Sequence, residues 1–111
     1  MNKTEYKFAL NKNMELSDKY TEIIRFAEML LRKRIDFKIE KLYDGHRVGV
    51  YWKGVEIGDA IEHCGSYGTE ENLIEIRGFH TNDDVIGYLT AEEAFELAEK
   101  ALEWYNTPSD V

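Results

Sequence analysis

The chain has 111 residues, 43% of them hydrophobic, with a single cysteine and a net charge of -8 at pH 7. This length predicts one domain over residues 1–111, and a single cysteine excludes an internal disulfide. Residues 1–6 lack the apolar core of a signal peptide, and no run approaches the roughly 20 apolar residues of a membrane span. We therefore expect a cytoplasmic protein with no membrane partner.

The first predicted helix follows a segment, residues 1–16, that fits either a loose arm or a short strand. We expect the helix to begin at Ser17, whose hydroxyl can accept hydrogen bonds from the free amides of the first turn. Its buried stripe is predicted to contain Ile23, Ile24, Ala27, Leu30 and Leu31. The basic run 32–34 puts positive charge at the negative end of the helix dipole, which predicts the end of the helix.

After this helix the apolar period changes to two, which indicates strands with one buried face. Four strands are predicted, at residues 35–40, 46–52, 55–62 and 73–79. Asp44 and Gly45 predict a tight turn with positive φ at both central residues. The third strand is expected to place on one side Val55, Ile57, Asp59 and Ile61.

The last helix is marked by a capping box, because Thr90 is followed three residues later by Glu93. Residues 80–89 before it are predicted as a loop, and residues 106–111 after it as a tail. The order helix, four-stranded antiparallel meander, helix predicts an α+β fold with both helices packed on one face of the sheet. The expected core contains Phe37, Val48, Val50, Ile76, Phe95 and Leu102.

The stretch HCGSYGTEEN, residues 63–72, holds the only cysteine and is the expected connection between the third and fourth strands. Catalysis by Cys64 would need a base oriented by a third group. His63 is adjacent, but neighbours in extended chain point to opposite faces, which favours His46 or His80, brought close by folding. No known cysteine-enzyme signature surrounds Cys64. We therefore predict no catalytic residue, and we expect Cys64 to be a small buried thiol at the end of a strand.

A metal site in this region would draw on His63, Cys64, His80 and Asp83 or Asp84. Zinc sites usually contain pairs of ligands at close spacing, and no such pair is present. The glycines that flank Ser66 and Tyr67 supply the conformations of a wide turn. We predict no metal and no cofactor, and expect Tyr67 to be either packed or presented to a partner.

The acidic residues are unevenly distributed along the chain. Residues 1–34 carry eight Lys/Arg and five Asp/Glu, whereas residues 54–111 carry two and fourteen. In the last helix Glu92, Glu96, Glu99 and Glu103 recur at the spacing that forms one row opposite the apolar face. A second acidic patch is expected at Asp59, Glu70 and Glu71. Such a charge distribution repels nucleic acid and attracts a basic protein partner.

The blocks GSYGTEENLIEIRGF and GYLTAEEAFELAEKAL together cover 31 of the 111 residues. They resemble segments of small proteins encoded by phages and mobile elements of Gram-positive bacteria, a group that includes anti-CRISPRs. The resemblance implies an inhibitor that binds a nucleic-acid-handling protein of the host. It carries over no catalytic residue, and the basic residues of the first half depart from the uniformly acidic pattern of a nucleic-acid mimic.

Three functions are therefore open. The first is a non-enzymatic protein-binding module, of phage-inhibitor type, whose acidic face occupies the basic nucleic-acid-binding surface of a host nuclease or effector. The second is a small ligand-binding or hydrolytic domain centred on His63, Cys64, Ser66 and Tyr67. The third is a housekeeping interaction subunit whose acidic face serves only solubility. The place of the functional residues distinguishes the first function from the second, because docking surfaces are exposed and flat whereas active sites are concave.

Overall fold

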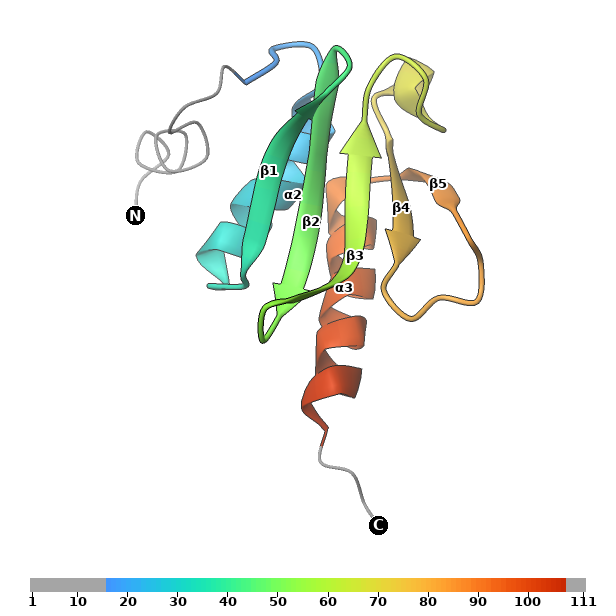
Figure 1. The fold of residues 1–111 in the computed structure, drawn as a ribbon. Coiled ribbons are helices and arrows are strands. Elements are labelled where there is room, and N and C mark those ends of the chain that lie inside the picture. Colours follow the sequence, from blue (N-terminus) through green and yellow to red (C-terminus); the bar gives the residue numbers. More distant parts are fainter. Residues whose placement is uncertain (1–15, 108–111) are drawn as a thin grey trace.

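The computed structural model describes residues 16–107, which form two α-helices and one sheet. The elements are, in chain order, α2 (Thr21–Arg32), β1 (Phe37–Leu42), β2 (Gly45–Trp52), β3 (Val55–Glu62), the 3₁₀ helix η1 (Thr69–Glu71), β4 (Ile74–Gly78), β5 (Ile86–Leu89) and α3 (Ala91–Asn106). The strands form an antiparallel sheet in the order β1-β2-β3-β4-β5, and both helices lie behind it in Figure 1. The predicted α+β class is confirmed, and the predictions for residues 1–15 and 108–111 lie outside the described residues.

The sheet has five strands among these residues, so the prediction of four strands was wrong. The missed strand is β5, which lies in the segment predicted as a loop. It has only four residues, and its pairing with β4 is irregular between Ile74 and Ile76. A strand this short, with Gly87 inside it, has too few alternating positions to produce a recognisable pattern.

Helix α2 begins four residues later than predicted, at Thr21 instead of Ser17. The Ser17 hydroxyl accepts the N–H of Lys19, and the Ser17 N–H donates to Nε2 of His46. Ser17 therefore holds the turn before the helix. The free N–H of Ile23 instead donates to the carboxylate of Glu62, a distant residue that sequence spacing cannot connect with this helix.

The β1–β2 turn also differs from the prediction by one residue. Its central residues are Tyr43 and Asp44, and of these only Tyr43 has positive φ, at 52°. Gly45 is the first residue of β2, where a Cβ atom would lie 1.8 Å from the carbonyl oxygen of Glu62. Glycine is needed at position 45 because the neighbouring strand passes so close, and not because of the turn.

A β-bulge in β3 overturns the prediction that Val55, Ile57, Asp59 and Ile61 share one side. Val50 pairs with Gly58 and Tyr51 pairs with Glu56, so Ile57 is an extra residue. As a result Ile57 belongs to the core, whereas Asp59 binds Arg47 and Val55 is 66% exposed. One inserted residue is enough to reverse the alternation of a strand.

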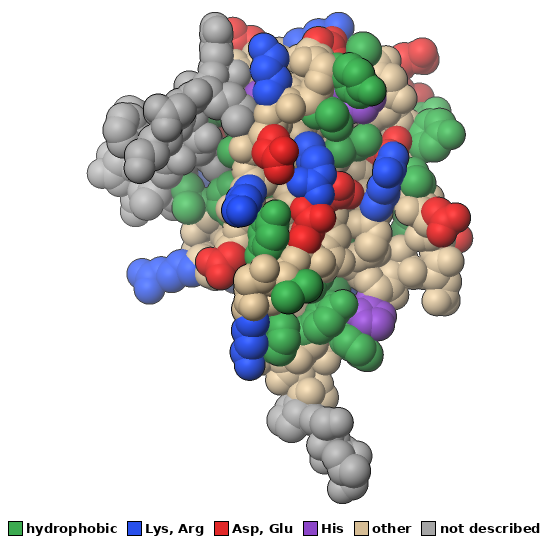
Figure 2. All heavy atoms as spheres, viewed as in Figure 1, with side chains coloured by type: hydrophobic (Ala, Val, Ile, Leu, Met, Phe, Trp, Pro, Cys, Tyr) green, Lys and Arg blue, Asp and Glu red, His purple; other side chains and the backbone are tan. Residues whose placement is uncertain are grey.

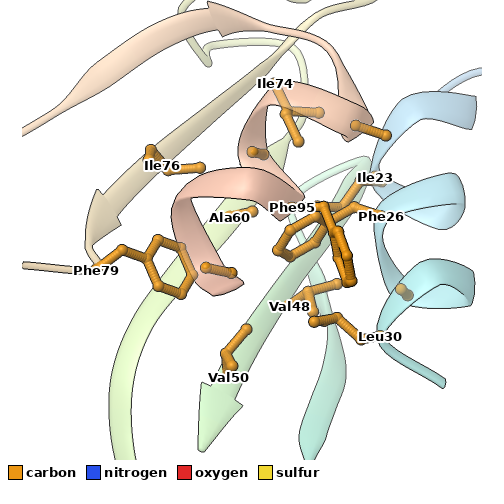
Figure 3. Packing of buried hydrophobic residues seen from close by; sticks show 14 of the residues in the cluster. Ile23, Phe26, Leu30, Val48, Val50, Ala60, Ile74, Ile76, Phe79 and Phe95 are labelled. Carbon is orange, nitrogen blue, oxygen red and sulfur yellow. The ribbon is translucent and has the colours of Figure 1, made fainter. Parts of the chain in front are cut away.

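The core lies between the sheet and the two helices. The helices contribute Phe26 and Phe95, and the paired strands contribute Val48, Ala60 and Ile76 (Figure 3). Of the six predicted core residues, Val48, Val50, Ile76 and Phe95 are buried, and Phe37 and Leu102 are half-buried against them. The capping box of α3 is confirmed: the Thr90 hydroxyl accepts the N–H of Glu93, and the Glu93 carboxylate accepts the N–H of Thr90.

This packing predicts that Phe95→Ala lowers the free energy of unfolding by about 3–5 kcal/mol, the usual loss for a buried phenyl ring. Trp104→Ala is a matched control on the same helix, because Trp104 is 59% exposed. Trp104→Ala should lower the free energy of unfolding by about 1 kcal/mol or less. Both values can be measured by chemical denaturation, and equal losses for the two variants would contradict the position assigned to Phe95.

Candidate functional site

The predicted row of glutamates, Glu92, Glu96, Glu99 and Glu103, lies on the exposed side of α3. Two members are already paired. Glu92 forms an ion pair with Arg25 of α2, and Glu96 lies 3.5 Å from Nζ of Lys100. Glu99 and Glu103 have no ion-pair partner among residues 16–107. Only half of this glutamate row is therefore free to attract a basic partner.

The pairing of Glu92 has a structural purpose. Arg25 also binds Glu22, with Nη1 2.6 Å from Oε1, and the other oxygen of Glu22 accepts the N–H of Ala91 at 2.6 Å. These contacts join the N-terminal part of α2 to the first turn of α3, where the helix dipole favours negative charge. Glu92 therefore helps to fix the angle between the helices.

A groove of about 700 Å³ borders the free half of the row. Its apolar surface comes from Ile35, Trp52 and Leu102, and one wall carries Glu96, Glu99 and Glu103. The facing segments are basic: they contribute Lys33, Arg34 and Lys53. The positive charges oppose the field of the glutamates, which makes this surface weaker as a mimic of nucleic acid than the sequence suggested.

The loop between β3 and β4 holds the second group of predicted residues. Tyr67 lies at its tip and is held by its backbone, because its N–H donates to Glu75 at 2.9 Å and its carbonyl accepts the N–H of Tyr88 at 3.2 Å. Gly87 gives Tyr67 room, since a Cβ atom there would lie 2.4 Å from Cβ of Tyr67. The backbone of Tyr67 is thus fixed in position, whereas its side chain is 61% exposed.

Tyr88 is exposed to the same extent, 60%, and borders the same small cavity as Tyr67, Glu70 and Glu71. Neither glutamate has an ion-pair partner within the described part of the chain. We call these four residues the tyrosine–glutamate surface. Sequence reasoning missed Tyr88, because it lies in the strand that was predicted as a loop.

Asp59 does not belong with Glu70 and Glu71 as predicted. It lies in the middle of β3, half-buried, with Oδ2 2.8 Å from Nε of Arg47. Glu40 and Glu56 bind the same guanidinium, and Figure 2 shows side chains of both charge signs gathered on the sheet face turned away from the helices. Burial raises the pKa of Asp59, and Arg47 opposes that shift. Asp59 is therefore held in an ion-pair network around Arg47.

Cys64 is exposed, so the expectation of a buried thiol was wrong. The chain turns directly after β3, and the Cys64 N–H donates to Oδ1 of Asp44 at 2.9 Å. The two predicted bases make other contacts. His46 is buried and accepts the Ser17 N–H, and His80 packs on the Trp104 ring, with ring centroids 3.7 Å apart. Neither of these two histidines is therefore paired with Cys64.

Two buried polar residues, His46 and Glu62, lie opposite each other on β2 and β3. Burial is the main cause that lowers the pKa of His46 and raises the pKa of Glu62. Within residues 16–107, Nδ1 of His46 and Oε2 of Glu62 have no hydrogen-bond partner. Oε1 of Glu62 accepts the N–H of Ile23 at 3.0 Å, which gives this carboxylate a structural role as the cap of α2.

Comparison with protein-family models, with curated proteins and with solved structures gives no match for this chain. Among the residues described, no helix has the length and apolar character needed to cross a membrane. The candidate site therefore rests on the geometry of the chain itself.

The buried Glu62 predicts a specific pH dependence. Because its pKa in the folded chain lies above the ordinary value of 4.5, folding favours the protonated form. Its contribution to stability is complete below pH 4.5 and declines as the pH rises through the raised pKa. Glu62→Gln removes this titration and keeps an oxygen for the N–H of Ile23. The unfolding free energy of the wild type should therefore fall relative to that of Glu62→Gln as the pH rises, and a constant difference in denaturation curves would refute the assignment.

Proposed function

We propose that this protein is a non-enzymatic protein-binding module, and that the tyrosine–glutamate surface is the centre of its docking site. The observation that carries the proposal is the pair Tyr67 and Tyr88, exposed at the surface while their backbones are hydrogen-bonded to each other. Tyrosine is enriched among the residues that dominate binding energy. A loop whose backbone is already held in place loses less entropy on association.

The backbone of Tyr88 adds a second argument. Its φ is 60°, in the left-handed region that favours glycine. A tyrosine there costs of order 1 kcal/mol or more in backbone strain. Its ring is mostly exposed, so burial in this chain returns little of that cost. Contact with a partner is a reason to keep a tyrosine at this position.

The charge of the surface indicates the kind of partner. Glu70 and Glu71 are exposed and unpaired within the described residues, and residues 54–111 carry fourteen acidic side chains against two basic ones. We propose a basic protein surface as the partner. The narrower proposal is a phage-type inhibitor, similar to anti-CRISPRs, that covers the nucleic-acid-binding surface of a host protein.

The glutamate row is the second candidate for the docking site, because Glu99 and Glu103 are free of ion pairs within residues 16–107. Partner binding by two variants with two charge reversals each distinguishes the sites. One variant carries Glu70→Lys and Glu71→Lys, and the other carries Glu99→Lys and Glu103→Lys. Both change the net charge by the same amount at exposed positions, so a long-range effect of charge is equal in both.

We expect the reversal at Glu70 and Glu71 to weaken binding of a partner captured from a bacterial lysate by at least about tenfold, mainly through a slower on-rate. The reversal at Glu99 and Glu103 should have a smaller effect. Surface plasmon resonance at low and high salt measures both, since a charged interface weakens with ionic strength.

A loss of binding confined to the Glu99 and Glu103 variant would move the docking site to the glutamate row. Salt-independent binding that neither variant changes would refute a charged docking site altogether. Duplex DNA added as a competitor tests the narrower proposal, because it should displace this protein only from a partner that binds both at one surface.

Tyr88→Gly separates binding from folding. It removes the exposed ring and relieves the left-handed backbone, so the unfolding free energy should stay within about 1 kcal/mol of the wild type. Loss of a dominant contact should cost about 2 kcal/mol of binding, roughly thirtyfold in Kd. Trp104→Ala, an exposed aromatic residue outside the proposed site, is the control and should leave Kd within about twofold. Equal Kd values for Tyr88→Gly and the wild type would exclude Tyr88 from the interface.

A further inference from the structure

Asp44, His63 and Cys64 lie together at the end of the sheet that carries the β3–β4 loop. Within residues 16–107 they are a group whose metal-ligating atoms, one from each residue, all lie within 4.8 Å of one another. Asp44 comes from the β1–β2 turn, and the other two come from the chain directly after β3. Sequence spacing could not reveal this group, because Asp44 is far from His63 along the chain.

The fold holds the side chains of Asp44 and His63 and the backbone of Cys64 in place. The Cys64 N–H donates to Asp44 Oδ1 at 2.9 Å, and the Tyr20 hydroxyl donates to Oδ2. The backbone N–H of His63 donates to Ser66 Oγ at 3.0 Å, and the Tyr43 ring packs on the imidazole, with ring centroids 5.0 Å apart. A preorganised set of ligands needs little rearrangement to bind an ion.

The chemistry of the set suits one class of metal ion. Imidazole nitrogen, thiolate sulfur and carboxylate oxygen are the three ligand types that zinc takes in proteins. Asp44 and Cys64 are exposed, which leaves the fourth position of a tetrahedral ion to water.

We propose that Asp44, His63 and Cys64 bind one Zn²⁺ ion, with water as the fourth ligand. This goes beyond the expectation from sequence that the chain has no metal site, and it replaces His80, Asp83 and Asp84 with Asp44 as the partner of His63 and Cys64. His80 lies after β4, at the opposite end of the sheet (Figure 1).

Binding must change one local contact. Nδ1 of His63 accepts the Gly65 N–H at 2.9 Å, so the ring proton lies on Nε2. An ion at Nδ1 displaces the Gly65 N–H directly. An ion at Nε2 moves the ring proton to Nδ1, which then donates, and the Gly65 N–H has to turn away. In both cases the ion and the Gly65 amide compete for one imidazole, and the thiol of Cys64 loses its proton to solvent.

The test is titration of the reduced protein with Zn²⁺ by calorimetry and with Co²⁺ by absorption spectroscopy. We expect one ion per chain, with a thiolate-to-cobalt charge-transfer band. Cys64→Ser should abolish that band, and both Cys64→Ser and Asp44→Asn should weaken Zn²⁺ binding by at least about tenfold, as the loss of a ligand requires. Asp83→Asn is the matched control and should bind like the wild type.

Asp44→Asn keeps a side-chain oxygen that can accept the Cys64 N–H, so this variant should fold. Cys64 is exposed, and its replacement decides the question even if Asp44→Asn does not fold. Absence of saturable binding by the wild type overturns the proposal, as does wild-type affinity in Asp44→Asn, which would mean that Asp44 is not a ligand. Cys64→Ser should keep the binding of a protein partner, so that this proposal and the proposed function can fail separately.

Discussion

The buried carboxylate of Glu62 connects the parts of this structure that matter most. It ends β3, lies opposite His46 on β2, and accepts the N–H of Ile23 in the first turn of α2. A buried ionisable group is costly unless it is hydrogen-bonded, and a free helix N-terminus is costly unless it is capped. One contact reduces both costs. It also fixes the point at which the chain leaves the sheet for the loop that carries Cys64 and Tyr67.

The position of this loop depends on close contacts between backbones. Gly45 lets β2 pass the carbonyl oxygen of Glu62, and Gly87 lets β5 pass Tyr67. Buried Glu75 then accepts the Tyr67 N–H, so the loop tip is hydrogen-bonded to the strand that follows it. Since a Cβ atom at either glycine would displace backbone or side-chain atoms, the geometry of the loop is specified by residues without side chains as much as by those with them.

Sequence predicted the parts of the fold that depend on local periodicity. The two helices, four strands and the Thr90 capping box follow from patterns within a few residues, and they are present. The errors occur where distant parts of the chain decide the local structure. The start of α2 depends on Glu62, the two sides of β3 depend on the bulge at Ile57, and β5 depends on pairing with β4. The same limit applies to function: the glutamate row was visible in the sequence, but its partner Arg25 and the position of Tyr88 beside Tyr67 were not.

The proposed docking surface would combine two kinds of interaction that act at different stages of binding. The acidic charge of residues 54–111 reaches beyond contact distance, so it favours encounter with basic surfaces and disfavours nucleic acid. Contact itself depends on shape, which the charge does not specify. In the glutamate row, Glu92 and Glu96 form ion pairs with Arg25 and Lys100, so part of the negative charge is balanced within the chain. At the β3–β4 loop, Glu70 and Glu71 have no ion-pair partner within residues 16–107, and they border the same cavity as two exposed tyrosines whose backbones are hydrogen-bonded. Attraction and a defined shape would coincide there. This coincidence, more than the amount of charge, distinguishes a docking surface from a merely solvated acidic face.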